Sequence, residues 1–395
     1  MKVRHRSKYK GSVLVLATTI GVIVGLLGMT MIQLGLHSRL LAIRNVQSIT
    51  ARCAADAGTV EAVYKMQKKL ITETTWDNGN LPSASDQALS NSPSKYSYGL
   101  TGDPMAGFTI TSTGVCAMAT KIIHSILRIG SYWEGINVKG HVDLRNCGFL
   151  GVIGPGVPSD LTIRSNTTEI NDMIFRNFVT VPGDVVCGPG GNPNVVVDAK
   201  ENTIILGQTY AAPEEMLFPD VPVPPNMIYC GSILDDAVLS HPGRYQYDTI
   251  NLPHNAVLRI NTDVVLYVTG RMVLNNAAGV IVSPSGSLEL YLGTSLEDKN
   301  SSGITNETNT AVKMKIYGLP QCTQIDLKAK SDLYAAVYAP NADIILYNAG
   351  DFYGAIAGNS FDMRNSGDYY FDTNLSSTNP DDPAAAFVIY RWWED

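Results

Sequence analysis

The stretch "SVLVLATTIGVIVGLLGMTMIQLGL", Ser12–Leu36, runs for 25 positions (36 − 12 + 1) without a formally charged residue. A helix of this length rises about 37 Å at ~1.5 Å per residue, which exceeds the ~30 Å hydrocarbon core of a bilayer. A secretory signal has an apolar core of only ~7–15 residues that leads to a small-residue cleavage site. This run instead continues into "LHSRLLAIR", Leu36–Arg44, which offers no such site. The sequence therefore predicts a transmembrane helix over 12–36 that contacts lipid and serves as a lasting anchor.

Residues 1–11 form a short basic leader in front of this helix. Five basic side chains lie in its first ten positions: Lys2, Arg4, Arg6, Lys8 and Lys10. Positively charged flanks of a transmembrane helix stay on the cytoplasmic side of the membrane. We therefore expect a single-pass protein with a cytoplasmic N-terminus, and with everything beyond residue 36 across the membrane.

The helical pattern does not stop at the predicted membrane boundary but continues through residues 37–75 as an amphipathic helix. An apolar stripe repeats every three or four residues and contains Val46, Ile49, Cys53, Ala57, Val60 and Val63. The small residues "AADAG", Ala54–Gly58, would let another helix approach closely. The alternative is a helix that folds onto its own domain. The pattern ends at "TTWDNGNLPS", where Asn, Gly and Pro favour a turn.

Two segments of this region resemble a known family. "KGSVLVLATTIGVIVGLLGMT", Lys10–Thr30, and "ARCAADAGTVEAV", Ala51–Val63, are similar to the N-terminal region of the PilX/GspK-like subset of type IV pilin and pseudopilin proteins. The resemblance implies that prepilin peptidase cuts after Gly11, which would make Ser12 the new N-terminus. An uncleaved anchor is the alternative, and it has the same topology.

The sequence departs from the family pattern at Leu16. Major pilins carry a glutamate at this fifth mature position, where its carboxylate pairs with the amino terminus of a neighbouring subunit, and they usually begin with Phe rather than Ser. A carboxylate in hydrocarbon is tolerated only when it is paired, and a subunit with none above it has no amine to pair with. The missing glutamate is therefore typical of tip or accessory members of the family.

Composition limits the classes of partner. The net charge is −7, the isoelectric point is near 5.4 and only 16% of residues are charged. This argues against nucleic acid as a partner, because phosphate binding needs a basic face. The six cysteines include no C-x-x-C pair, which excludes zinc-finger and thioredoxin-like sites. They are compatible with one or two disulfides in an exported protein or with buried free thiols.

Beyond the helix the sequence predicts a mainly β protein, which makes the fold class α+β. We expect a β-hairpin or connecting region over 76–130, an extracytoplasmic β-solenoid over 131–375, and a linker with a closing strand over 376–395. The body contains short apolar runs such as "VVLYV" and "LELYL", separated by Gly and Asn, which tolerate the left-handed backbone of tight corners. A parallel β-helix is favoured over an antiparallel sandwich, because the strands are short and two-residue hairpin turns are scarce.

The same region resembles an uncharacterised repetitive β domain that often follows PilX-type N-termini in bacterial envelope proteins. The resemblance is carried by "IRSNTTEINDMIFRNFVTVPGDVVCGPGGNPN", Ile163–Asn194, and by "LYAAVYAPNADIILYNAGDFYGAIAGNSFDMRNSGDYYFD", Leu333–Asp372. It implies location in the inner membrane of a bacterium, with the body periplasmic or displayed at the cell surface. It implies no established activity.

No catalytic constellation is recognisable, and we expect neither a cofactor nor a metal. A glycosidase-like site needs carboxylates on one face of adjacent coils. The candidates for such a site are Asp184, Asp198, Asp235, Asp236 and Asp263, with Arg244 and Arg259, but single Asp residues at turns usually cap the turn. Tyrosines near the end could bind a surface polysaccharide or protein or could stack within the fold; they are Tyr334, Tyr338, Tyr347, Tyr353, Tyr369 and Tyr370.

These patterns together favour a minor or accessory subunit, with tip subunit as one form of it, of a type IV pilus or type II secretion pseudopilus. Its partners would be other pilin-like subunits and the inner-membrane assembly machinery. A membrane-tethered surface adhesin or envelope scaffold is the second hypothesis. A β-helical carbohydrate-active enzyme is the third.

Overall fold

The computed structural model describes residues 12–72, 76–104, 106–145, 147–200, 202–329, 332–348, 350–364, 367–376, 382 and 384–395. The chain divides into two compact units, each considered by itself. Unit 1 contains the described residues of Met1–Met66, Asp77–Arg128 and Ile389–Asp395, and unit 2 contains those of Gln67–Trp76 and Ile129–Val388.

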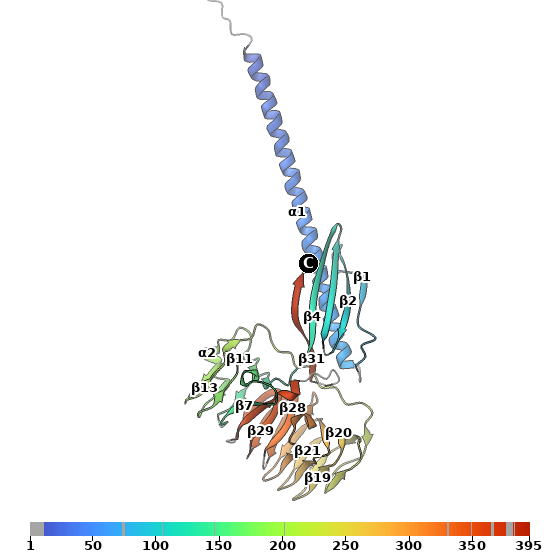
Figure 1. Cartoon of the computed structure of the whole chain (residues 1–395), viewed down its shortest axis with the longest axis vertical. Helices are drawn as coiled ribbons and strands as arrows, with labels where there is room; N and C mark the ends of the chain where they lie inside the picture. The colour runs from blue at the N-terminus through green and yellow to red at the C-terminus, as the bar shows by residue number, and fades with distance from the viewer. Residues whose placement is uncertain are drawn as a thin grey trace, which may run out of the picture. The chain divides into compact units, whose positions relative to one another are not determined.

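The first element is a single uninterrupted helix, α1 (Ser12–Thr72), of 61 residues (Figure 1). Its sequence contains no proline, and Leu and Ala, which favour helix, are frequent in it. It runs through both the apolar segment and the amphipathic segment that the sequence indicated. A long N-terminal apolar helix followed by a large β-rich region confirms the predicted α+β class.

Unit 1 also contains an antiparallel sheet in the order β1–β2–β3–β4–β31. The strands are β1 (Ala84–Ala88), β2 (Lys95–Asp103), β3 (Gly107–Cys116), β4 (Ala119–Ser131) and β31 (Ala385–Glu394). The register between β3 and β4 runs from Phe108↔Leu127 to Cys116↔Ala119, which leaves a tight turn between the two strands. Burial alternates along β3, so one face of the sheet is covered and the other is more open.

The last strand differs from its expected role. The expectation from the sequence was a strand that closes the β-solenoid. The structure instead pairs β31 with β4 at the edge of the antiparallel sheet. Its aromatic and alternating sequence is equally suitable for any sheet edge, so the pattern does not distinguish the two positions.

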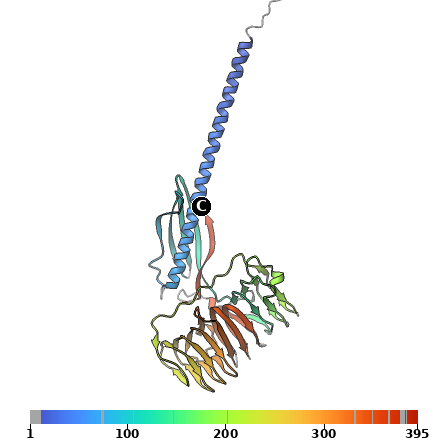
Figure 2. The ribbon, with the colours of Figure 1, turned by 180° about the vertical axis from the view of Figure 1, so that it is seen from behind.

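Unit 2 contains parallel strands stacked side by side, as Figure 1 and Figure 2 both show. Its described strand pairs are parallel, so the antiparallel sandwich is wrong. Between residues 263 and 306, three ladders recur in turn along the chain, and partners are 24 residues apart in each: Val264↔Leu288, Met272↔Leu296 and Val280↔Ile304 (288 − 264, 296 − 272 and 304 − 280).

Ladder 1 has the strand order β15–β17–β20–β23–β26–β28–β29–β5–β8–β11–β14. The bounds of its strands are β15 (Ile228–Tyr229), β17 (Gly243–Tyr247), β20 (Asp263–Val268), β23 (Ser287–Leu292), β26 (Met314–Gly318), β28 (Leu333–Asn348), β29 (Phe352–Met363), β5 (Ile136–Val138), β8 (Ile163–Ser165), β11 (Val185–Cys187) and β14 (Thr209–Ala211).

Ladder 2 has the order β18–β21–β24–β27–β28–β29–β6–β9–β12, in which the long strands β28 and β29 take part again. Its other strands are β18 (Ile250–Leu252), β21 (Arg271–Leu274), β24 (Ser295–Asp298), β27 (Gln324–Ala329), β6 (Val142–Asp143), β9 (Met173–Phe175) and β12 (Val197–Ala199).

Ladder 3 has the order β16–β19–β22–β25. Its strands are β16 (Ala237–Leu239), β19 (Val257–Ile260), β22 (Gly279–Val282) and β25 (Gly303–Asn306). The remaining pairs are β29–β30–β7 and β10–β13, with β30 (Tyr369–Asp372), β7 (Leu150–Ile153), β10 (Thr180–Val181) and β13 (Ile204–Ile205). The short helices are α2 (Pro193–Val196), η1 (Pro158–Asp160), η2 (Ala311–Lys313) and η3 (Thr373–Ser376).

The core lies between the ladders, because every second residue of each strand points inward. In β20 the inward residues are Val264, Leu266 and Val268, all nearly or fully buried. Their partners on β23 are Leu288, Leu290 and Leu292, also buried. Apolar side chains thus form continuous columns across successive strands, and burial of these columns is the main force that holds the unit together.

Asparagine residues at the corners adopt the left-handed backbone that the sequence analysis expected of them. Asn276 and Asn300 have φ of 39° and 51°. They are 24 residues apart, and the Nδ2 of Asn300 donates a hydrogen bond to the Oδ1 of Asn276 at 2.5 Å. Stacked corner amides therefore fix the register of neighbouring turns.

The order of strands in ladder 1 is not the order of the chain. Strands β5 to β14 extend the ladder away from β29, which pairs with β5 through Ile356↔Ile136. After β14 the chain returns along a proline-rich segment before it starts the other half at β15. Tyr132 and Tyr338 donate their hydroxyls to the carbonyls of Leu217 and Pro219 in this segment, at 2.5 and 2.8 Å.

A buried carboxyl at the end of β24 is expected to make stability depend on pH. Asp298 is nearly fully buried, and desolvation raises its pKa to about 6, above the ordinary value of about 3.9. The folded state therefore binds the proton more tightly than the unfolded state. Stability is highest below the unfolded pKa, and it falls as pH rises through the window from about 4 to about 6.

We expect Asp298→Asn to stabilise unit 2 at pH 8, by up to about 3 kcal/mol for a shift of ~2 pKa units, and to have little effect at pH 4. The measurement is chemical unfolding of the full chain in detergent at both pH values. The readout is the difference in the free energy of unfolding between the wild type and Asp298→Asn. A difference that does not change between pH 4 and pH 8 would contradict the expectation.

Candidate functional site

The N-terminal part of α1 presents apolar side chains that the described residues of unit 1 leave exposed. Residues from Leu14 to Leu36 are exposed, among them Leu16, Ile20, Val24 and Leu34. Among the described residues, α1 is the one helix long and apolar enough to cross a membrane by length and composition. Gly11, the residue before the predicted cleavage, lies outside the described residues, and Ser12 is the first residue of α1.

One face of the C-terminal part of α1 is buried within unit 1. It contains Ala51, Ala54, Ala55, Ala62 and Met66, all fully buried. These positions follow the three- and four-residue spacing of a helix face. The helix therefore folds onto its own domain. This was one of the two alternatives that the sequence left open.

This buried face explains the small residues of "AADAG". The Oγ of Ser112 on β3 donates a hydrogen bond to the carbonyl of Ala55 at 2.7 Å. A Cβ atom on Gly114 would lie 1.9 Å from the carbonyl oxygen of Ala51. The small residues thus admit strand β3, where the sequence predicted the approach of another helix. Gly114, which that analysis did not single out, completes the close approach.

The predicted apolar stripe lies on the opposite face of the helix. Val46, Ile49 and Val60 are 63%, 62% and 68% exposed. Cys53 is exposed as well, and Ala57 and Val63 are half-buried. At 3.6 residues per turn, the stripe and the buried face of Ala51, Ala54, Ala55 and Ala62 point in opposite directions. Packing of the domain on α1 therefore leaves the stripe uncovered.

Polar contacts fasten the buried side of α1 to the sheet. Lys65 forms an ion pair with Glu61 at 2.6 Å, and the hydroxyl of Tyr96 donates to Glu61 at 2.5 Å. These hydrogen bonds, from Lys65 and then Tyr96, hold the pKa of Glu61 below its usual value. On the edge strand, Glu394 pairs with Arg52 at 3.2 Å and with Lys121 at 2.7 Å. The orientation of the helix on its sheet is thus fixed, and so is the direction in which the stripe points.

The carboxylates considered for catalysis have other partners. Asp184 accepts from the backbone N–H of Gln208 at 2.7 Å, and Asp236 accepts from that of Val257 at 2.6 Å. Asp235 accepts from the N–H of Asp236 at 2.8 Å. Asp263 accepts from the hydroxyl of Ser287 at 2.5 Å. Asp198 forms an ion pair with Lys200 at 2.8 Å. Arg244 donates to the carbonyl of Pro225 at 2.9 Å, and Arg259 lies 3.7 Å from Glu307. In these contacts each carboxylate joins a turn, a side chain or an ion pair, and the one contact between two candidates is the backbone N–H of Asp236 donating to Asp235.

The part of the chain that the structure describes holds no group of three or more His, Cys, Asp or Glu side chains arranged for a metal ion. All six cysteines lie within that part and are free thiols, with Cys53 and Cys230 exposed and the other four buried. The structure therefore favours free thiols over disulfides.

Five of the six candidate tyrosines fall into two groups, and the sixth, Tyr347, is half-buried with Lys328 and Arg364 over its ring. Tyr338 and Tyr369 are fully buried in the core. Tyr334, Tyr353 and Tyr370 form a half-exposed stack on successive strands, with ring centroids 4.5 and 4.9 Å apart. Most ring faces in this stack are therefore occupied by a neighbouring ring, which supports the stacking alternative for these three.

Comparisons with known proteins add little about function. Residues 226–378 match the family model "Domain of unknown function (DUF7305)". The match covers 153 residues (378 − 226 + 1) of 395 and coincides with the strands from β15 to β30. No curated protein matches.

Among solved structures, the chain is similar to the competence-associated pilin ComZ from Thermus thermophilus. The two are 11% identical, the alignment covers 88% of this chain and 98% of that chain, and the TM-score is 0.23. A likeness at this score carries no inference about fold or function.

Proposed function

We propose that this chain is a pilin-like subunit, anchored in the bacterial inner membrane by residues 12–36, that assembles with other pilin-like subunits through α1. The supporting observation is that two opposite faces of the helix have different surroundings. Its domain covers one face and leaves the apolar stripe of Val46, Ile49, Cys53, Ala57, Val60 and Val63 on the other. Exposed apolar area of this kind in water favours association.

The same proposal includes the type of subunit and its position in a filament. Leu16 stands where major pilins of the resembled family carry a glutamate, so a minor or accessory subunit, with the tip as one position, fits this chain best. A type IV pilus and a type II secretion pseudopilus both satisfy the physical argument. We include cleavage between Gly11 and Ser12 by the assembly machinery, with the N-terminus cytoplasmic and the body outside.

We further propose that the segment 131–375 winds as a parallel β-helix. The offset of 24 residues that three neighbouring strand pairs share and the recurring order of three ladders support a coil with three sides. Such a body displays a large surface beyond the membrane, which suits adhesion or recognition. Bond-making chemistry is not part of the proposal, because the candidate carboxylates have the structural partners described above.

Lysine substitutions on the stripe test assembly. Burial of each apolar side chain between helices would contribute ~1.5–3 kcal/mol to assembly. In Ile49→Lys/Val60→Lys this contribution is lost, and each lysine would place a charge in the contact between helices. We expect the amount of chain in sheared filaments, relative to the membrane fraction, to fall at least about ten-fold.

Two variants control for folding and for added charge. Ile49→Leu/Val60→Ile keeps the stripe apolar and should assemble like the wild type. Val238→Lys places a lysine on β16 at a similarly exposed apolar position and should also assemble. Normal assembly of the stripe variant would refute the proposal, and a wild-type chain that never enters filaments would favour the membrane-tethered adhesin.

A further inference from the structure

Ladder 2 contains a repeated acid–x–base motif that has no role in the proposed function. It occurs as "EDK" at Glu297–Lys299, "DLK" at Asp326–Lys328, "DMR" at Asp362–Arg364, "DLR" at Asp143–Arg145 and "DAK" at Asp198–Lys200. On β9 the acid is replaced, and the corresponding run is "IFR" at Ile174–Arg176. Each run lies at the end of a strand of ladder 2 or directly after it.

The parallel register places these motifs on successive strands. Asp362 is the partner of Asp143, and Asp143 is the partner of Ile174. Backbone hydrogen bonds continue the register past the strand ends, from Arg364 N to Leu346 O and from Lys200 N to Phe175 O. The bases therefore form one row along the ladder. We call it the basic row: Lys299, Lys328, Arg364, Arg145, Arg176 and Lys200.

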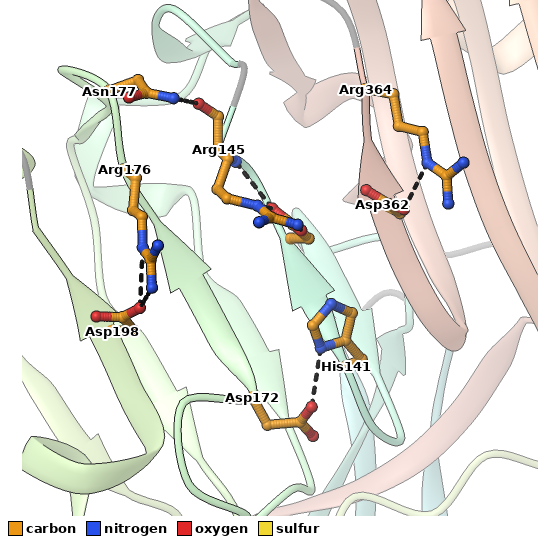
Figure 3. Close-up of polar contacts among 9 residues, drawn as sticks. His141, Arg145, Asp172, Arg176, Asn177, Asp198, Asp362 and Arg364 are labelled. Atoms are coloured by element: carbon orange, nitrogen blue, oxygen red, sulfur yellow. Dashed lines mark hydrogen bonds and ion pairs between the residues drawn. The ribbon is translucent and has the colours of Figure 1, made fainter.

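Two of the acids, Asp143 and Asp198, are buried beneath exposed bases. The side chains of Asp143 and Asp198 are only 4% and 1% exposed, whereas those of Arg145, Arg176 and Lys200 are 49%, 31% and 62% exposed. Figure 3 shows Arg145, Arg176 and Arg364 on neighbouring strands, with dashed contacts from Arg176 to Asp198 and from Arg364 to Asp362. The positive groups therefore reach solvent, whereas the carboxylates of Asp143 and Asp198 that orient Arg145, Arg176 and Lys200 do not.

The ion pairs hold each guanidinium in place. Arg145 uses Nε and Nη2 to bind Asp143, and Arg176 uses the same two nitrogens to bind Asp198. Burial of Asp198 opposes its ionisation, but hydrogen bonds from Lys200 and Arg176 outweigh burial and lower its pKa. In the described contacts of Arg145 and Arg176, Nη1 has no hydrogen-bond partner. Each of these groups thus presents a preoriented donor on its outer side.

Tyr347 occupies the place in the row between Lys328 and Arg364. Lys328 is its partner in the register, and the ammonium lies 5.1 Å from the centre of the ring. The guanidinium of Arg364 lies 5.4 Å from the same centre, and its Nη1 donates to the Tyr347 hydroxyl at 3.0 Å. The ring therefore keeps the row continuous where a base is missing.

We propose that the basic row binds a linear acidic polysaccharide that lies along ladder 2. Neighbouring parallel strands are ~4.8 Å apart, and one ring of an extended polysaccharide advances by a similar length. A chain with one carboxylate per sugar would therefore meet about one cation per strand. This inference concerns unit 2 and does not depend on filament assembly.

One observation favours a polysaccharide over a single-stranded nucleic acid. Nucleic-acid grooves of that kind supply aromatic faces on which bases stack, whereas Lys328 and Arg364 lie against the ring of Tyr347, the one aromatic in the row.

The experiment measures binding of fluorescent polygalacturonate to the full chain in detergent micelles at low salt. Fully methyl-esterified polygalacturonate serves as the neutral counterpart, and oligothymidylate serves as the nucleic-acid probe. We expect binding of the acidic polymer alone, with weaker binding as salt rises. Arg145→Gln/Arg176→Gln/Lys200→Gln should weaken it about ten-fold or more, from the loss of three exposed charge contacts.

Three variants separate binding from folding. Arg145→Lys/Arg176→Lys keeps the charges and should retain most of the affinity. Lys200→Gln/Lys299→Gln leaves the arginines that pair with buried Asp143 and Asp198 in place and should still weaken binding several-fold. Arg259→Gln/Lys313→Gln removes two cations outside the row and should not change it. Equal affinity for the neutral polymer, unchanged affinity of both Gln variants of the row, or tighter binding of oligothymidylate would each overturn the proposal.

Discussion

Replacement of Gly114 by alanine is expected to destabilise unit 1 by about 3 kcal/mol, at the upper end of the usual cost of overpacking. The new Cβ atom would lie 1.9 Å from the carbonyl oxygen of Ala51 and 2.5 Å from the backbone nitrogen of Ala55. Both contacts are with the backbone of α1, which cannot rotate away as a side chain can. Helix and strand must therefore separate, and the hydrogen bond from Ser112 to Ala55 would be lost with them.

Gly99 on β2 provides the matched control, because a Cβ atom there would meet nothing within 4 Å. Gly99→Ala should be neutral or slightly stabilising, since glycine weakens a strand relative to alanine. The measurement is amide hydrogen exchange of β2 and β3 in the full chain in detergent. Equal exchange rates in the two variants would show that α1 does not pack on β3 as described.

The second large effect is expected at Asp382, which gathers several partners within unit 2. It forms an ion pair with Lys315, and it accepts hydrogen bonds from Trp133 Nε1 at 3.2 Å, from the Tyr317 hydroxyl at 3.1 Å and from the N–H of Ala384 at 2.9 Å. The side chains of Asp382 and Lys315 are 7% and 17% exposed. Asp382→Ala would leave the Lys315 charge nearly buried and unpaired, which costs about 3–5 kcal/mol.

Thermal unfolding of the full chain, followed by circular dichroism of its β structure, measures this loss. Asp382→Asn/Lys315→Gln removes both charges but keeps hydrogen-bonding groups, and it should recover most of the stability. Asp263→Ala is the exposed counterpart, because Asp263 and Lys313 lie 3.9 Å apart with side chains 70% and 52% exposed, and it should cost less than about 1 kcal/mol. A similar loss in Asp382→Ala and Asp263→Ala would contradict a buried ion pair.

The sequence predicted the elements that local pattern determines. A charge-free run of 25 residues (12–36) specifies an apolar helix, and the alternation in runs such as Val264–Val268 specifies half-buried strands. The sequence also located the stripe of Val46, Ile49 and Val60 by its spacing. Local pattern could not say whether this stripe or the alanine-rich face would meet the domain, because both follow helical spacing.

Long-range pairing was beyond the sequence. Ile356 pairs with Ile136, and Trp133 meets Asp382 across 249 positions of the chain. Short apolar strands are nearly interchangeable as neighbours. The order of strands in ladder 1 therefore depends on all of the strands together, and the sequence of one strand does not predict its neighbours. The acid–x–base repeat behind the basic row was visible in the sequence, but a search for catalytic carboxylates passes over acids that are paired two residues away.

Photo-cross-linking from position 53 tests most directly whether another subunit covers the exposed stripe of α1. A benzophenone amino acid would replace Cys53, and cells that assemble filaments would be irradiated before the filaments are sheared off and isolated. We predict a covalent product in the filament fraction that joins this chain to the N-terminal helix of another pilin-like protein. A chain that is absent from that fraction, or that stays at its monomer mass there after irradiation, would contradict the proposed assembly.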